Sequence, residues 1–133
     1  MGESVVEEFV DAHYLKGEYI AVRSDGGNFY LAEVRLFITA RGQNYHKIEV
    51  LADVLVKDNK ESFKIRWFDV SGEDNVYVRS FRDTIHLQSV VCPEVKLKKE
   101  TRGRFRLEKP MLDKIKRRMR QALQADSLRS EEN

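Results

Sequence analysis

The sequence predicts a mostly β protein: a small antiparallel barrel with a short N-terminal helix and a basic amphipathic C-terminal helix. Three observations carry this prediction. About six short runs of alternating apolar and polar residues are separated by turn-forming residues. No helical pattern alternates with these runs, and a barrel would remove the exposed edges they otherwise present. After the last run, the chain becomes basic. At 133 residues, a single domain is expected: a barrel at 17–92, a basic extension and helix at 95–125, and a frayed tail at 126–133.

The first elements follow from capping and turn residues. Ser4 and Glu7 have capping-box spacing and apolar residues follow at helical intervals, which predicts a helix at 5–13. A first strand is expected from Tyr19 to Val22. The turn at Ser24–Asn28 contains two adjacent glycines, which take positive φ at no steric cost. This segment therefore predicts a hairpin.

The later strands are separated by polar and glycine-containing segments. A loop is expected at Ala40–Asn44 and a helical turn at Ser80–Thr84. Further strands are expected at Phe29–Phe37, Ile48–Val56, Phe63–Phe68, Val76–Val78 and Ile85–Cys92. The apolar positions of these strands predict a core containing Ile20, Val22, Ala32, Val34, Ile65 and either Val76 or Val78.

The composition limits the class of protein. One cysteine, Cys92, allows no internal disulfide and fits a reducing compartment such as the cytosol or nucleus. No apolar run approaches the roughly 20 residues of a membrane span, and the acidic N-terminal segment does not resemble a signal peptide. The three histidines are far apart in the sequence, and no nucleophile has a local base. We expect no metal, no cofactor and no enzymatic activity.

The net charge of +2 hides an asymmetry along the chain. Residues 1–95 carry 11 basic and 16 acidic residues, whereas residues 96–120 carry 12 basic and 3 acidic ones. A concentrated basic segment predicts a polyanionic partner such as DNA or RNA; the alternative is a solvated helix face and strand edge. The candidate nucleic-acid-binding residues form three groups, each expected to share one side of its element: Lys96, Lys98 and Lys99; Arg102, Arg104 and Arg106; and Lys114, Arg117 and Arg118.

The C-terminal helix is expected to begin at Pro110, where the missing N–H of proline costs least. The two preceding groups of basic residues predict two extended pieces around a turn at Thr101–Gly103. Apolar residues then recur at helical spacing and predict a stripe that packs on the barrel. The stripe consists of Met111, Leu112, Ile115, Met119, Ala122 and Leu123.

The segment from Phe63 to Phe81 combines aromatic residues with acidic turn residues and contains the single tryptophan, Trp67. A rigid aromatic ring beside a carboxylate favours cations, so this segment predicts a recognition surface. The alternative is that Trp67 is the largest core residue of a small sheet. The candidate peptide-binding residues are Tyr30, Trp67, Phe68, Asp69, Glu73, Asp74, Tyr77 and Phe81.

Two stretches give the chain a resemblance to Tudor domains. Residues 20–34, IAVRSDGGNFYLAEV, are similar to the Tudor opening, and residues 65–72, IRWFDVSG, are similar to the later Tudor strand. The resemblance implies an aromatic cage for methylated lysine or arginine, with Tyr30 as a cage ring and Trp67 and Asp69 at motif positions. Arg23 and Val70 stand where the family usually has aromatic residues. Phe68, Tyr77 or Phe81 would then supply the missing rings.

A second resemblance covers residues 65–90, where IRWFDVSGED and NVYVRSFRDTIHLQSV are similar to the bromo-adjacent homology pattern. Both families imply a nuclear, chromatin-associated reader. We therefore expect a non-enzymatic module that recognises a histone or other basic peptide, methylated or not, with auxiliary nucleic-acid contact through the basic segment. The alternatives are a direct DNA- or RNA-binding domain and a protein–protein adaptor that uses its terminal helices.

Overall fold

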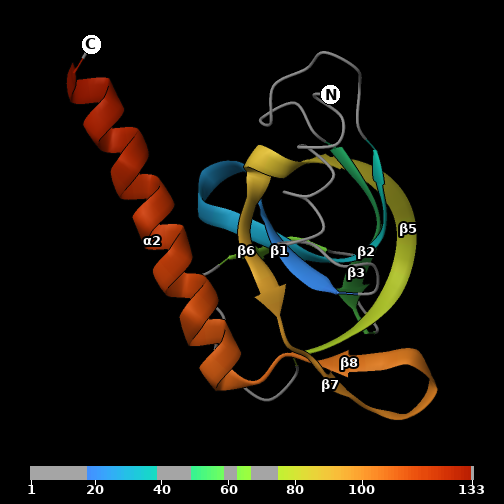
Figure 1. Cartoon of the computed structure of the whole chain (residues 1–133). Coiled ribbons are helices and arrows are strands. Elements are labelled where there is room, and N and C mark those ends of the chain that lie inside the picture. Colours follow the sequence, from blue (N-terminus) through green and yellow to red (C-terminus); the bar gives the residue numbers. More distant parts are fainter. Residues whose placement is uncertain (1–17, 39–48, 59–62, 67–74, 133) are drawn as a thin grey trace.

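An antiparallel sheet curves into a barrel-like shape, and a long helix lies along one side of it (Figure 1). The computed structural model describes residues 18–38, 49–58, 63–66 and 75–132. The expected mostly β, barrel-like fold with a basic C-terminal helix is confirmed. The helix expected at 5–13 and the loop expected at Ala40–Asn44 lie outside the described residues.

The sheet has the strand order β6-β1-β2-β3-β5-β8-β7, and the short β4 pairs with β2. Short 3-10 turns η1 (Asp25–Gly27), η3 (Leu87–Ser89) and η4 (Thr101–Gly103) connect strands, and the chain ends in α2 (Lys109–Glu132). The strands are β1 (Tyr19–Arg23), β2 (Asn28–Ile38), β3 (Glu49–Lys57), β4 (Ile65–Arg66), β5 (Val76–His86), β6 (Val90–Val95), β7 (Lys98–Lys99) and β8 (Arg104–Arg106).

The β1–β2 hairpin forms where the glycine pair predicted it. Gly26 and Gly27 have φ angles of 64° and 76°, in the left-handed region that favours glycine. The Ser24 N–H donates to the Asn28 carbonyl at 2.9 Å and closes the turn. This hairpin places Tyr30 opposite Val22.

The helical turn expected at Ser80–Thr84 is wrong, because β5 runs without interruption from Val76 to His86. Its pairing with β3 satisfies backbone groups that a helical turn would have taken out of the ladder. Ile85 therefore belongs to β5 and not to the closing strand. That closing strand, β6, begins at Val90 after η3 and continues through Pro93 to Val95.

Two hydrophobic clusters lie on opposite faces of the sheet. The helix-side core contains Tyr19, Ala21, Phe29, Leu31, Leu55, Ile65, Tyr77, Cys92, Val95, Phe105, Leu107, Leu112, Ile115 and Met119. The opposite-face core contains Ile20, Val22, Ala32, Val34, Val50, Ala52, Ile85 and Leu87. The sheet therefore buries apolar residues on both faces. In β1, as a result, four consecutive residues are buried.

The expected core residues of β1, β2 and β4 are buried, but the expectation for β5 is wrong. Val76 and Val78 are partly exposed, and Tyr77 is fully buried instead. Tyr77 lies opposite Phe105 in the β5–β8 ladder, so both rings point to the helix-side core. Because side chains alternate along a strand, the flanking valines point the other way.

The basic extension is part of the sheet and not an appendage to a barrel that ends at residue 92. The β7–β8 hairpin pairs with β5 through β8 and turns at Thr101–Gly103, where a turn was expected. In α2, Leu112, Ile115 and Met119 are buried against the sheet, as the apolar stripe predicted. The helix continues to Glu132, beyond residue 125, where the sequence predicted its end.

Candidate functional site

Three aromatic rings from separate segments form an aromatic cluster, defined here as Tyr30, Phe63 and Phe81. Tyr30 lies on β2, Phe63 precedes β4 and Phe81 lies on β5. The Phe63 ring centroid is 5.4 Å from that of Tyr30 and 5.5 Å from that of Phe81, with interplanar angles of 88° and 80°. Phe63 therefore joins the other two rings through edge-to-face contacts, which are favourable aromatic geometries.

The aromatic cluster is accessible on one side and buried on the other. Phe81 is 43% exposed, one of the two large exposed hydrophobic residues in the described part of the chain. Tyr30 packs against the opposite-face core. Burial raises the pKa of the Tyr30 phenol, and the negative charge of Asp83 raises it further. The cluster thus combines an exposed aromatic ring with a nearby carboxylate.

The structure brings together two of the predicted peptide-binding residues, Tyr30 and Phe81, and adds Phe63. Tyr77, another candidate, does not belong to this cluster, because its side chain is fully buried in the helix-side core. The sequence identified Phe63 only as a strand residue. Its place in the cluster depends on ring contacts with β2 and β5, which are distant in the sequence. The remaining candidates, Trp67, Phe68, Asp69, Glu73 and Asp74, lie outside the described residues.

The basic hairpin does not present all its charges on one side. Lys98 lies opposite Arg106 and Lys99 opposite the buried Phe105, so the two lysines point to different faces. The expectation that Lys96, Lys98 and Lys99 share a side is therefore wrong, because adjacent strand residues alternate. Arg102 occupies η4 with a φ of 57° and is exposed.

Two of the hairpin arginines already have acidic partners. The Arg104 Nε lies 3.2 Å from an Asp58 carboxylate oxygen. The Arg106 Nε–H donates to Glu100, and this hydrogen bond lowers the pKa of the Glu100 carboxyl. Their charges are thus partly balanced within the chain.

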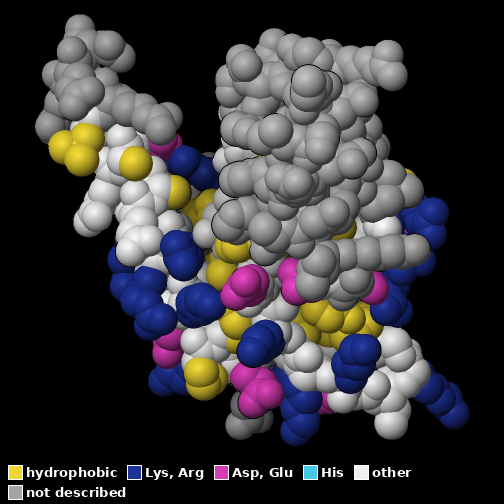
Figure 2. Space-filling model, in the orientation of Figure 1, with side chains coloured by type: hydrophobic (Ala, Val, Ile, Leu, Met, Phe, Trp, Pro, Cys, Tyr) yellow, Lys and Arg dark blue, Asp and Glu magenta, His cyan; other side chains and the backbone are white. Residues whose placement is uncertain are grey.

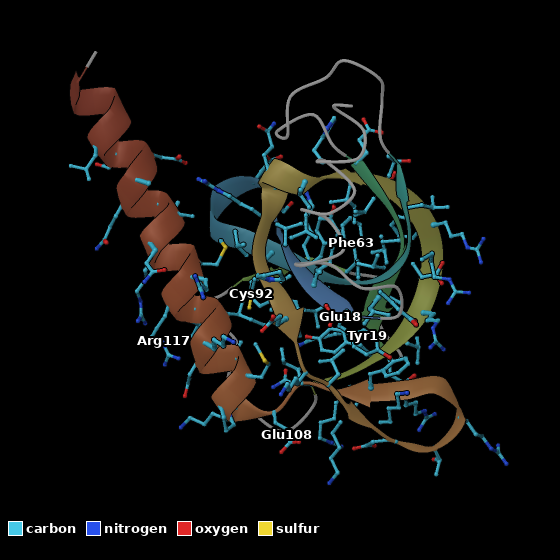
Figure 3. All side chains as sticks on the ribbon, in the orientation of Figure 1. Glu18, Tyr19, Phe63, Cys92, Glu108 and Arg117 are labelled. Atoms are coloured by element: carbon cyan, nitrogen blue, oxygen red, sulfur yellow. The ribbon has the colours of Figure 1, made fainter. Side chains whose placement is uncertain are left out.

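The basic residues of α2 lie apart from the hairpin. Lys114 and Arg118 are close enough to Cys92 on β6 to influence its thiol, whose pKa is raised mainly by burial. Arg117 lies on the side of the helix away from the sheet (Figure 3). The hairpin and α2 extend in different directions (Figure 1). On the face in Figure 2, basic side chains are spread over the molecule with acidic side chains between them.

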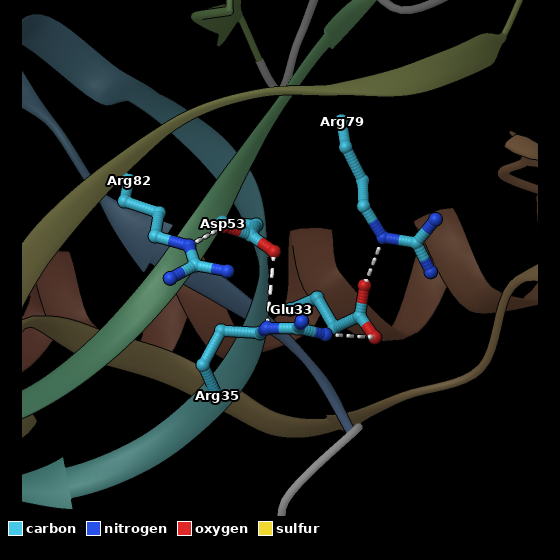
Figure 4. Close-up of polar contacts among 5 residues, drawn as sticks. All are labelled: Glu33, Arg35, Asp53, Arg79 and Arg82. Carbon is cyan, nitrogen blue, oxygen red and sulfur yellow. Dashed lines mark hydrogen bonds and ion pairs between the residues drawn. The ribbon is translucent and has the colours of Figure 1, made fainter.

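A second polar assembly, which sequence reasoning missed, crosses β2, β3 and β5. We call it the arginine network: Arg35, Arg79 and Arg82 around Glu33 and Asp53 (Figure 4). Arg79 Nε–H donates to Glu33 at 2.5 Å, and Arg82 Nε–H donates to Asp53 at 3.0 Å. Arg35 contacts both carboxylates, at 3.7 Å from Glu33 and 3.2 Å from Asp53. Glu33 and Asp53 are 6% and 8% exposed and stand directly opposite each other in the ladder.

Arg79 connects this network to the helix-side core. Its guanidinium carbon lies 4.8 Å from the centroid of the Phe105 ring, in a cation–π arrangement. Its positive charge also lies close to Tyr19, whose ring is 5.1 Å from that of Phe105. The hydrogen bond to Glu33 raises the pKa of Arg79. The Arg79 guanidinium is therefore held in position by contacts with Glu33 and Phe105.

A pocket of about 440 Å³ lies near the start of β1 and the end of β6. It contains none of the predicted peptide-binding residues, and its lining residues are Glu18, Tyr19, Glu94, Val95, Lys96 and Leu97. Within the described ranges, no group of three or more His, Cys, Asp or Glu side chains is arranged to hold a metal ion. In the same part of the chain, no helix has the length and apolar character of a membrane span.

No protein-family model, curated protein or solved structure matches this chain. The aromatic cluster is suited to holding a cation beside ring faces and a carboxylate. The arginine network is suited to holding an anion.

Proposed function

We propose that this chain is a non-enzymatic, chromatin-associated binding module that recognises a histone or other basic peptide, methylated or unmethylated, through its aromatic cluster. The observation that carries the proposal is the near-perpendicular packing of Tyr30, Phe63 and Phe81 beside Asp83. Perpendicular rings form the walls of a corner in which a lysine or methyl-lysine cation meets more than one ring. Asp83 supplies the negative charge that favours this ligand.

A Tudor-like barrel is the finer fold that we propose for this module. The resemblance of residues 20–34 to the Tudor opening supports it, because this stretch covers β1, the glycine turn and the start of β2. Tyr30, the residue that matches a Tudor cage position, belongs to the aromatic cluster. A nuclear location follows from this proposed function.

Phe81→Ala is the direct test of peptide recognition, because an exposed ring can be removed with little effect on folding. An array of histone-tail peptides with unmethylated to trimethylated lysines would identify the best ligand, and calorimetry would give its Kd. We expect Phe81→Ala to weaken binding about fivefold, since a cation–π contact contributes roughly 1 kcal/mol. Tyr30→Ala should weaken binding as well.

Leu128→Ala is the matched control, because Leu128 is the other large exposed hydrophobic residue of the described chain, 60% exposed on α2. It should bind peptide like the unaltered protein. Peptide affinity should also change little with salt, since ring faces are less screened than phosphate contacts. Unchanged affinity in both Phe81→Ala and Tyr30→Ala would reject the aromatic cluster as the site.

The auxiliary part of the proposal is nucleic-acid contact through the basic segment. Lys98, Lys99 and Arg102 are exposed on the hairpin and support this part. Replacing Arg102, Arg104 and Arg106 by alanine should lower affinity for DNA or RNA. It should also lower the slope of log affinity against log salt, by roughly 0.7 to 0.9 per lost phosphate contact. An intact slope after this triple change would exclude the hairpin arginines.

A further inference from the structure

Each guanidinium group of the arginine network contacts a buried carboxylate through its Nε, and Arg35 also contacts Glu33 through a terminal nitrogen. Through Nε, Arg79 contacts Glu33, while Arg35 and Arg82 contact Asp53. In Arg82, whose side chain is 60% exposed, the described residues offer no further ion pair to the two terminal nitrogens. A guanidinium held by one edge presents a fixed pair of donors on the other, the geometry that binds phosphate oxygens bidentately.

The network places an energetically costly pair of like charges inside the sheet. Glu33 and Asp53 are direct cross-strand neighbours, and like charges at such positions destabilise a sheet. Burying both carboxylates adds a desolvation cost. The arginines offset this cost, and with three cations against two anions the network keeps one net positive charge. Apolar residues at positions 33 and 53 would avoid this cost. The two carboxylates instead hold the three arginine side chains at the surface of the sheet.

We propose that Arg35, Arg79 and Arg82 form a binding surface for the phosphate backbone of a nucleic-acid strand. The surface includes neither the aromatic cluster nor Arg104 and Arg106 of the hairpin, although Arg79 lies against Phe105 of that hairpin. Arg35, on β2, and Arg79 and Arg82, on β5, are separated by two strand spacings, roughly 10 Å. That span exceeds a single phosphate group and suits consecutive phosphates of one strand.

Two lysines lie at the ends of a neighbouring cross-strand row on the same sheet face. Lys57 lies opposite Tyr77, which lies opposite Phe105, which lies opposite Lys99. Cross-strand partners point to the same face, so this row carries a lysine at each end. Leu55 and Arg79 form the adjacent row of that face. The middle of this face is buried, because Tyr77, Phe105 and Leu55 belong to the helix-side core, so the lysines lie at its two ends and the arginines themselves form the binding surface.

The test is binding of a short fluorescent single-stranded oligonucleotide, followed by anisotropy over a range of salt concentrations. Arg82→Gln should weaken binding about tenfold, because a charge-assisted hydrogen bond is lost. It should also lower the salt slope by roughly 0.7. Arg82→Lys retains the charge but not the paired donors, so it should recover the slope and only part of the affinity. Arg23→Gln is the control, since Arg23 pairs with Asp126 of α2 at 2.5 Å, outside the network.

A second measurement needs no variant. Modification of arginine by a dicarbonyl reagent, mapped by mass spectrometry, should show Arg82 protected by the oligonucleotide and Arg23 unprotected. Wild-type binding by Arg82→Gln, or equal modification of Arg82 with and without oligonucleotide, would overturn the proposal. Protection by a phosphoserine peptide but not by the oligonucleotide would also overturn it. Because the hairpin triple variant leaves Arg35, Arg79 and Arg82 intact, failure of the hairpin contact and failure of this surface are distinguishable.

Discussion

The hydroxyl of Tyr77 is buried and has no hydrogen-bond partner among the described residues. The ring fills the helix-side core opposite Phe105, so its size is needed but its oxygen is not. An unsatisfied buried polar group costs about 1–3 kcal/mol. Tyr77→Phe keeps the ring and removes the oxygen, and it should raise the free energy of unfolding by about 1 kcal/mol at neutral pH. Urea unfolding followed by circular dichroism measures this change.

The same residue predicts a pH dependence. Burial raises the pKa of the Tyr77 phenol above its ordinary value of 10.0. Above that pH the unfolded chain loses the proton while the folded chain keeps it, so stability falls as the pH rises. Tyr77→Phe should lose less stability above pH 10 than the unaltered protein. Tyr30→Phe is the control at neutral pH, because the Tyr30 hydroxyl is not among the buried unsatisfied groups. A loss of stability in Tyr77→Phe would contradict this prediction and would show that the Tyr77 hydroxyl makes a hydrogen bond in the folded chain.

Individual residues differ in how far the sequence reveals them. The φ angles of Gly26 and Gly27 follow from local turn chemistry, so the sequence is sufficient to predict them. The burial of Tyr77 depends on which face of β5 meets β8, a pairing between residues distant in the chain. Alternation restricts the choice to Tyr77 or its neighbours Val76 and Val78. It does not decide between them, and the larger aromatic residue is the one in the core.

Helix α2 is held to the sheet by its first half. Leu112, Ile115 and Met119 are buried, whereas Leu128 is 60% exposed. Ile115→Ala should therefore lower the free energy of unfolding by about 3 kcal/mol, the typical cost of removing a fully buried aliphatic side chain. Leu128→Ala should change it by less than about 0.5 kcal/mol. Equal effects of the two substitutions would show that the helix is packed differently along its length.

Elements that have a turn, capping or periodicity pattern in their own sequence can be predicted from it. Elements whose bounds depend on strand pairing are predicted less well. The β1–β2 hairpin, the turn at Thr101–Gly103 and α2 each have their own turn, capping or periodicity signal. β5 has eleven residues and extends through Arg82–Thr84, polar residues whose sequence favours no strand. Their conformation is set by the β3 ladder, including Asp53 opposite Arg82. That ladder pairs residues that are distant in the chain, so the local sequence does not reveal it. The local sequence alone favoured a helical turn at Ser80–Thr84.

The two proposed binding surfaces also depend on strand pairing, which the sequence alone does not predict. Tyr30 and Phe81 were predicted from composition and resemblance, yet Phe63 joins them only because β2, β4 and β5 converge. The arginine network has no sequence signal, because its five members come from three strands and are separated by up to 49 positions. The basic C-terminal segment had the strongest sequence signal. In the structure its charges are divided between sheet faces and the helix.

The two cores share one sheet, and this predicts how the molecule unfolds. Ile20 belongs to the opposite-face core and its neighbour Ala21 to the helix-side core, so β1 cannot be lost without exposing both. The chain should therefore unfold in a single cooperative transition. Ile20→Ala and Ile115→Ala should each shift this transition without splitting it. Their effects should add to within about 0.5 kcal/mol in the double variant, since the two side chains belong to different clusters.

Hydrogen exchange measured by NMR on Ile115→Ala distinguishes this prediction from independent unfolding of the two cores. In a cooperative molecule, protection of the amides paired in β1–β2 and in β3–β5 falls by the same free energy. If the helix-side core opened alone, amides of α2 would lose protection while those around Val50 and Ile85 in the β3–β5 ladder kept theirs. That second pattern would mean that α2 is an accessory to an independently stable sheet. The opposite-face core would then be sufficient to hold the aromatic cluster in place.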